Sequence, residues 1–160
     1  MRSYQVFAAM SQEDATRFMK TLADEVPAMF NQALMAASAA MKARPVYLKR
    51  QPFEKRAAAV RRALSRVAAN PVADEVLAVY FLDCKKALLT EWLDLLGLEH
   101  EDGTLKDDTP EAPPDDKLTE SIEKYLGADD DADRGLLLRA FAAQEAVEWP
   151  TLDASFAGGT

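Results

Sequence analysis

The sequence predicts an all-α protein, a compact bundle of five to six helices with a long central helix and an acidic, proline-containing loop. All six glycines lie at or after position 97, so the first 96 residues lack the residue that most easily takes the positive φ angles of tight hairpins. Alanine, leucine, glutamate, lysine and arginine, the strongest helix formers, dominate between the prolines of this region. We expect a single helical domain over 1–160, with its core in 11–98, an acidic loop at 99–116 and a C-terminal helical segment at 117–160.

A proline separates the first two predicted helices. Ser11 is a good N-cap for a helix that starts after it, because its hydroxyl can accept a hydrogen bond from a free N–H of the first turn. Pro27 disfavours helical geometry at Val26, so we expect a break or kink there. The second helix, at about 28–43, is almost free of charge and should be largely buried.

Two further helices follow a connector at 44–52 that is bounded by prolines. The third helix is predicted at about 53–69, where apolar residues recur at spacings of three and four and form one stripe: Phe53, Ala57, Val60, Leu64 and Val67. The fourth, at about 72–96, is apolar on most of its circumference, which is typical of a helix at the centre of a bundle. Gly97 is expected to end it as a left-handed C-cap.

The last third of the chain begins with the acidic loop. Residues 99–116 carry eight acidic residues and three prolines, and Asp102-Gly103 is typical of a tight turn. A short helix is expected at about 117–126 and a final helix at about 132–148. The tail should dock by Leu152 and Phe156 and then fray.

Charge is segregated along the sequence. Residues 42–66 contain nine lysines and arginines and one acid, a net charge of +8, whereas residues 99–133 contain 14 acids and three lysines, a net charge of −11. On the third helix Lys55, Arg62 and Arg66 point away from the apolar stripe, where phosphate groups could bind. The alternative is that these cations form an ordinary solvated face. The chain's net charge of −8 repels nucleic acid, so we do not expect nucleic-acid binding.

The composition excludes many enzyme classes. The single cysteine, Cys84, excludes an internal disulfide framework, and the single histidine, His100, excludes every site that needs two histidines. The aspartates at 129, 131 and 133 form a DxDxD run, but Arg134 stands where a calcium loop requires glycine. Phosphate-binding loops, dinucleotide fingerprints and hydrolase motifs are absent. We therefore expect no catalytic residues, no cofactor and no metal site.

An apolar surface in the N-terminal helices suggests self-association. All six methionines fall within the first 41 residues, and methionine lines adaptable binding surfaces as well as cores. Small residues in the second helix would allow another helix to approach closely, so we expect a homodimer, or another protein partner. The predicted interface consists of Met29, Ala33, Ala36 and Ala40.

These observations give an ordered set of functional hypotheses. The first is an uncharacterised, non-catalytic protein-interaction or structural module. The alternative is a binder of phosphate ligands or nucleic acid that uses residues 42–66, and the second alternative is a metal-dependent enzyme that uses residues 99–133. The longest run without charge has 16 residues, Val26 to Met41, which is too short for a membrane span. We expect a cytoplasmic protein, and the abundance of alanine is typical of a GC-rich bacterial genome.

Overall fold

The computed structural model describes residues 1–128 and 130–157 and confirms the all-α class. Helices make up 71% of the structure, with ten α-helices and one two-stranded hairpin in the described part of the chain, more helices than the five to six expected. The chain divides into two compact units. The amino-terminal unit is Ser3–Cys84, and the carboxy-terminal unit is Met1–Arg2 with Lys85–Thr160. The expectation that residues 1–160 fold as a single domain stays a prediction.

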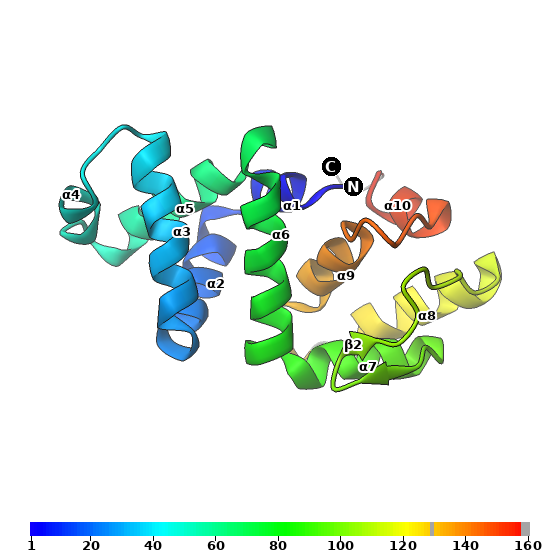
Figure 1. Cartoon of the computed structure of the whole chain (residues 1–160). Helices are drawn as coiled ribbons and strands as arrows, with labels where there is room; N and C mark the ends of the chain where they lie inside the picture. Colours follow the sequence, from blue (N-terminus) through cyan, green and yellow to red (C-terminus); the bar gives the residue numbers. More distant parts are fainter. Residues whose placement is uncertain (129, 158–160) are drawn as a thin grey trace. The chain divides into compact units, whose positions relative to one another are not determined.

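The amino-terminal unit is built of six α-helices and two short irregular helices (Figure 1). In order they are α1 (Ser3–Ala9), α2 (Gln12–Glu25), α3 (Pro27–Ala40), α4 (Pro45–Lys49), α5 (Phe53–Leu64), the 3₁₀ helix η1 (Val67–Ala69), α6 (Asn70–Val79) and the π-helix η2 (Tyr80–Cys84). The Ser11 hydroxyl accepts a hydrogen bond from the Asp14 N–H, 3.1 Å away, which confirms the predicted N-cap. Val26 leaves helical geometry, with φ −133° and ψ 66°, so Pro27 starts a new helix as predicted.

Aromatic rings and small residues form the core of this unit. Phe18 stacks on Tyr80 with ring centroids 4.0 Å apart, and Phe7 meets Phe18 edge-on. Helix α3 contacts both α2 and α5 and buries Ala33 and Ala37 completely. Packing within the unit explains the uncharged buried side of α3, whereas its other side exposes uncharged residues, among them Asn31, Gln32 and Met35, so the helix is less buried than expected.

The expected long helix at 72–96 is wrong. Helix α6 ends at Val79, the π-helix η2 follows, and Lys85 has non-helical angles, φ −130° and ψ 37°, before α7 begins at Lys86. Apolar residues surround the predicted helix because its two halves bury different faces in different units, α6 in the amino-terminal and α7 in the carboxy-terminal unit. A helix wheel drawn over 72–96 superimposes these two faces.

Two other boundaries differ from the prediction. Helix α5 ends at Leu64, where the Ser65 hydroxyl donates to the Arg62 carbonyl oxygen, and Val67 is 63% exposed. Val67 therefore does not belong to the buried apolar stripe that was predicted over 53–67. The expected connector at 44–52 contains a helix, α4, that begins at Pro45.

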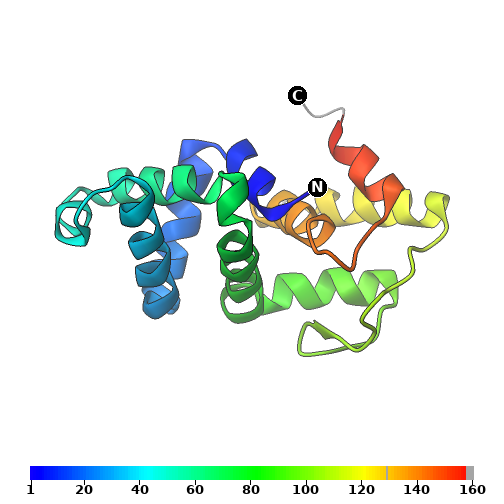
Figure 2. The same ribbon diagram turned by 45° about the horizontal axis from the view of Figure 1, so that its top comes forward.

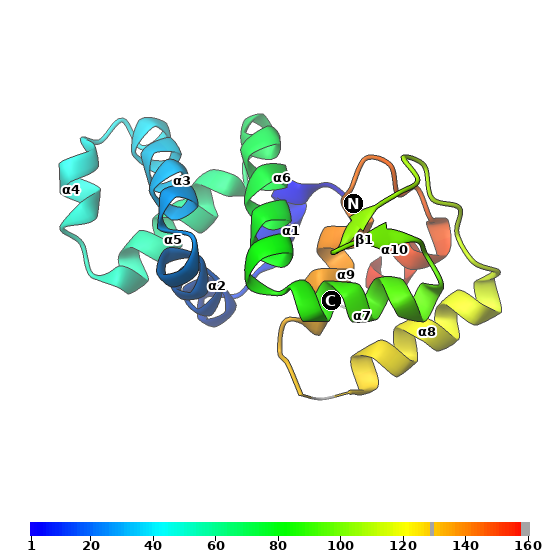
Figure 3. The same ribbon diagram turned by 60° about the horizontal axis from the view of Figure 1, so that its bottom comes forward.

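The described part of the carboxy-terminal unit contains four helices and the hairpin (Figures 2 and 3). They are α7 (Lys86–Leu96), β1 (His100–Glu101), β2 (Thr104–Leu105), α8 (Asp115–Gly127), α9 (Arg134–Ala142) and α10 (Pro150–Ala157). Gly97 has φ 73° and is the predicted left-handed cap, and Leu98 N–H bonds back to Leu93 O at 3.0 Å. Asp102 and Gly103 both have positive φ, 51° and 94°, so the predicted tight turn is confirmed and joins β1 to β2.

Rings from three helices and a loop form the second core. Trp92 of α7 contacts Tyr125 of α8 and Phe141 of α9, with centroids 5.2 and 6.0 Å apart, and Phe141 contacts Trp149. The final helix expected at 132–148 instead ends at Ala142. A separate helix begins at Pro150 and buries Leu152 completely, as predicted. Residues 158–160, where the chain end was expected to fray, lie outside the described residues. In the described part of the chain, no helix has the length and apolar character of a membrane span.

Candidate protein-interaction surface

Helix α4 and the turn before it expose an unusual combination of side chains. Leu48, 2% exposed, anchors this short helix, and α4 packs against α3. Leu48 is the one buried residue of α4, so other side chains of the helix are exposed to solvent: Val46 is 57% and Tyr47 58% exposed. Met41, in the turn before α4, is 47% exposed. We define the α4 surface as the exposed residues of 41–50, which are Met41, Lys42, Arg44, Val46, Tyr47, Lys49 and Arg50.

The cations of the α4 surface are available to a ligand. None of the nine lysines and arginines in 42–66 forms an ion pair within the amino-terminal unit. Arg56 and Arg61 are half-buried and used within the unit: Arg56 lies over the Phe53 ring, and Arg61 Nη1 donates to the Phe7 carbonyl oxygen. The other seven are exposed.

Lys42 has a strained backbone. Its φ is 54°, in the left-handed region where a side chain costs about 1 kcal/mol relative to glycine. The turn is a Schellman cap of α3, in which Lys42 N–H bonds to Ala39 O and Ala43 N–H bonds to Ser38 O. The equivalent position after α7 is Gly97. A lysine at the α3 cap thus keeps a cation on the α4 surface at a cost in stability.

The predicted anion-binding residues are exposed but do not all share one helix. Lys55 and Arg62 lie on α5, seven residues and about 10 Å apart along its axis. Arg66 follows the end of α5 and has extended angles, φ −88° and ψ 143°. The structure therefore keeps two of the three predicted cations on one helical face.

Half of the predicted dimer interface is buried within the chain itself. Met29 and Ala33 are 5% and 0% exposed, because α3 turns this face towards its neighbours in the amino-terminal unit. Ala36 and Ala40 are half-exposed and remain accessible to a partner. Sequence reasoning missed the α4 surface because residues 44–52 read as a connector. The signal in the sequence that could have indicated this surface is the apolar pair Val46-Tyr47, which lies between the cations Arg44 and Lys49.

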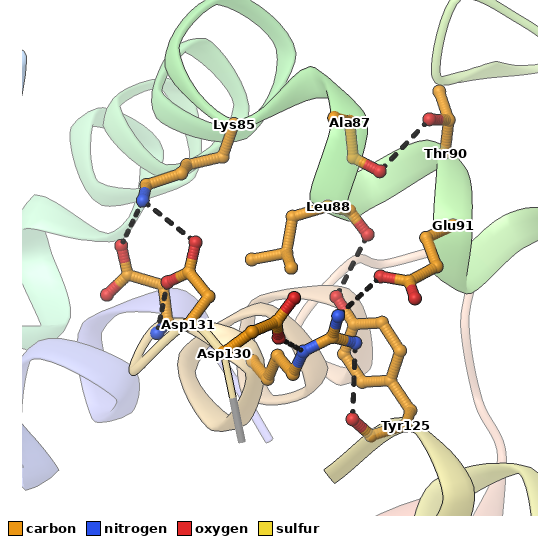
Figure 4. A network of polar contacts seen from close by, with 10 residues as sticks. Lys85, Ala87, Leu88, Thr90, Glu91, Tyr125, Asp130 and Asp131 are labelled. Atoms are coloured by element: carbon orange, nitrogen blue, oxygen red, sulfur yellow. Dashed lines mark hydrogen bonds and ion pairs between the residues drawn. The ribbon is translucent and has the colours of Figure 1, made fainter. Parts of the chain in front are cut away.

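The carboxy-terminal unit contains a network of charged groups that the sequence did not predict (Figure 4). Arg134, 5% exposed, pairs with Asp130 and Glu91, each at 2.7 Å, and its Nη1 donates to the Tyr125 carbonyl oxygen at 3.2 Å. Its guanidinium also lies 4.6 Å from the centroid of the Tyr125 ring. The hydrogen bond to Asp130, opposed by burial and supported by Glu91, raises the pKa of Arg134 above its ordinary value.

Lys85 forms the second half of this network. Its Nζ lies 3.1 Å from Asp131 and 3.4 Å from Asp133. Burial lowers the pKa of Lys85, but the hydrogen bond to Asp131 and the charges of both aspartates outweigh it, so that pKa is raised. Burial also raises the pKa of the Tyr125 phenol, which donates to the Leu88 carbonyl oxygen at 2.9 Å. The network ties together α7, α8 and the start of α9.

His100 and the described aspartates of the DxDxD run contact other residues of the carboxy-terminal unit. His100 Nδ1 accepts a hydrogen bond from the Gly103 N–H, which leaves the proton on Nε2, 2.7 Å from Asp94. Of the DxDxD run, Asp131 and Asp133 pair with Lys85, and Asp129 lies outside the described residues. Among the described residues no three His, Cys, Asp or Glu side chains gather as a metal site would require. Cys84 is half-buried at the end of η2.

Comparison with known proteins finds no matching protein family, no matching curated protein and no matching solved structure.

Proposed function

We propose that this chain is a non-catalytic protein-interaction module and that its partner binds on the α4 surface. The observation that carries the proposal is the composition of that surface. Six large hydrophobic residues are exposed in the described chain, and three of them, Met41, Val46 and Tyr47, fall within seven consecutive positions. Exposed apolar side chains gathered in one place, with cations around them, are typical of protein-binding sites.

The residue types also favour a protein partner. Tyrosine and arginine are enriched among the residues that dominate binding energies, and the surface has Tyr47 beside Val46, with Arg44 and Arg50 around them. Covering Val46 and Tyr47, each more than half exposed, would contribute roughly 1–2 kcal/mol apiece from apolar burial. The strained Lys42 is a second, independent indication, because backbone strain is concentrated at functional positions.

The non-catalytic role and a cytoplasmic location are parts of this proposal that rest on the sequence. One histidine and one cysteine leave few nucleophile and base combinations. A chain with one cysteine cannot use an internal disulfide.

Site-specific photocrosslinking tests the proposed surface. A benzophenone amino acid replaces Tyr47 in the full chain, in the cells that naturally produce it, and the matched control places it at Val67, which is 63% exposed on a different element. We expect a discrete adduct from position 47 that position 67 does not give and that Val46→Asp removes. Identical adducts from both positions, or an adduct that survives Val46→Asp, would contradict the proposal.

A second candidate function is supported by the exposed cations of α5. Lys55 and Arg62 form no ion pair with a described residue, so they could contact phosphate groups. Fluorescence anisotropy of labelled oligonucleotides at increasing salt tests this function. Binding that falls with salt and is weakened by Lys55→Glu with Arg62→Glu would support it, whereas no binding at low salt would exclude it.

A further inference from the structure

We propose that the α4 surface binds the acidic outer face of α8 in a second copy of this chain. This inference rests on the proposed function, because it assigns a partner to the same surface. Its starting point is the charge of the two units. The amino-terminal unit has 11 lysines and arginines against eight acids, a net charge of +3, and the carboxy-terminal unit has eight against 19, a net charge of −11.

Helix α8 presents an acidic face with one apolar residue. Asp116, Glu120 and Glu123 recur at spacings of four and three and are exposed, so they lie along one side of the helix. Leu126 continues this side, three residues after Glu123, and is 46% exposed. The opposite side packs into the unit through the buried residues Leu118, Ser121, Ile122 and Tyr125. We define the α8 face as Asp116, Glu120, Glu123 and Leu126.

The α8 face, like the α4 surface, has no ion pair within its own unit, although Asp116 Oδ1 accepts a hydrogen bond from the Lys117 N–H at 2.9 Å. None of its three carboxylates forms an ion pair with a described residue of the carboxy-terminal unit. Leu126 is the one large hydrophobic residue of the carboxy-terminal unit that is exposed in the described chain. The unit thus offers carboxylates and an aliphatic side chain together on one helix.

The two surfaces are complementary in both charge and polarity. The α4 surface has four cations and no acid around Val46 and Tyr47, and the α8 face has three carboxylates along the helix side that ends at Leu126. Opposite charges at the rim accelerate association and select the partner, while the apolar contact at the centre excludes water. A duplex or single strand of nucleic acid offers the charge without an aliphatic side chain, and the net charge of −8 repels it.

The pairing joins two different surfaces, so its symmetry limits the products. Two copies that exchange the contact reciprocally form a closed two-fold dimer, and copies that do not close form chains of increasing length. Either product satisfies the expectation of self-association from the sequence, through surfaces other than the one expected. In both, association must weaken as salt screens the charges.

Charge reversal on each surface provides the test. The basic-surface variant carries Lys49→Glu and Arg50→Glu, and the acidic-face variant carries Glu120→Lys and Glu123→Lys. All four positions are exposed, and circular dichroism checks that each variant is folded. The matched control, Lys55→Glu with Arg62→Glu, makes the same change of charge on α5, outside the α4 surface. Sedimentation equilibrium from about 1 to 100 µM measures association of each protein and of equimolar mixtures.

The expected results follow from the signs of the charges. Each surface variant alone faces like charge and should associate at least about tenfold more weakly than the wild type. The mixture of the two variants should recover association, because the reversed α4 surface of one meets the reversed α8 face of the other. The control should associate as the wild type does.

Three outcomes would overturn the inference. They are a wild type that stays monomeric at about 100 µM, a mixture that does not recover association, and a control that is weakened as much as the surface variants. A monomeric wild type that still gives the specific crosslink from position 47 to another protein would leave the proposed function standing and refute this inference alone. Oligonucleotide binding by the wild type that the basic-surface variant loses would assign the surface to nucleic acid and refute both.

Discussion

Replacement of Arg134 by methionine should destabilise the carboxy-terminal unit by about 2–5 kcal/mol. Methionine keeps an unbranched apolar stem beside Tyr125 and removes the guanidinium. The Tyr125 carbonyl oxygen then loses a charged donor 3.2 Å away, which costs about 1.5–3 kcal/mol. Loss of the cation–π contact with the Tyr125 ring adds about 0.5–2 kcal/mol. The side chains of Glu91 and Asp130 are at least half exposed, so their ion pairs contribute little.

Tryptophan fluorescence measures this effect in the correct unit. Both tryptophans, Trp92 and Trp149, belong to the carboxy-terminal unit, and Trp92 contacts the ring of Tyr125 at 5.2 Å. Urea unfolding followed by fluorescence therefore reports on the network. With an m-value of about 1.5 kcal/mol/M, the midpoint should fall by roughly 1–3 M.

A second arginine on the same helix provides the control. Arg139 is half-exposed and lies over the Phe156 ring at 5.5 Å, so Arg139→Met should cost less than about 1 kcal/mol. The reasoning is refuted if Arg134→Met costs no more than Arg139→Met, because the network would then contribute no more than a surface contact.

Three further predictions follow from single contacts. Lys42→Gly should raise the stability of the amino-terminal unit by about 1 kcal/mol, because it relieves the positive φ of 54°; thermal unfolding by circular dichroism measures it, and a loss of stability would show that Lys42 is not strained. Burial raises the pKa of the Asp131 carboxyl, but its hydrogen bond from the Asp133 N–H and its contact with Lys85 outweigh burial, so the pKa is lowered from 3.8. These interactions therefore stabilise the folded carboxy-terminal unit fully above that pH, and the stabilisation is lost as the pH falls through the lowered pKa. Lys85→Met should flatten this acid dependence of the fluorescence midpoint, while Lys86→Met, at an exposed neighbour, should leave it unchanged. Trypsin should cut first after Lys106, in the exposed run that precedes the buried Pro110, and first cuts within α5 or α7 would contradict this.

Local signals in the sequence were enough for the helix ends that depend on one or two residues. Ser11 caps α2, Pro27 separates α2 from α3, and Gly97 ends α7, all as predicted. The turn at Asp102-Gly103 is confirmed for the same reason. In each case the determining interaction lies within about four residues, and the residue type itself limits the backbone angles.

The candidate site was less predictable because exposure depends on neighbours distant in the sequence. The concentration of cations in 42–66 and the exposure of Lys55, Arg62 and Arg66 could be predicted from the sequence. That Val46 and Tyr47 are uncovered depends on Leu48 being the buried residue of α4, which no periodicity in a five-residue helix reveals. The contacts of Arg134 with Glu91 and Tyr125 join residues 43 and nine positions apart, and such pairs are set by packing.

The sequence alone determined that this protein is helical, where most of its breaks fall and how its charge is divided, since these are properties of composition and short-range geometry. Tertiary structure alone decided that the apolar stretch 72–96 is two helices in two units, that Met29 and Ala33 are core residues, and that the buried Arg134 has partners. The physical reason is that an apolar residue is stabilised by burial and a buried charged residue needs a partner, whichever neighbours provide them. Only the packing of the whole chain determines which neighbours those are.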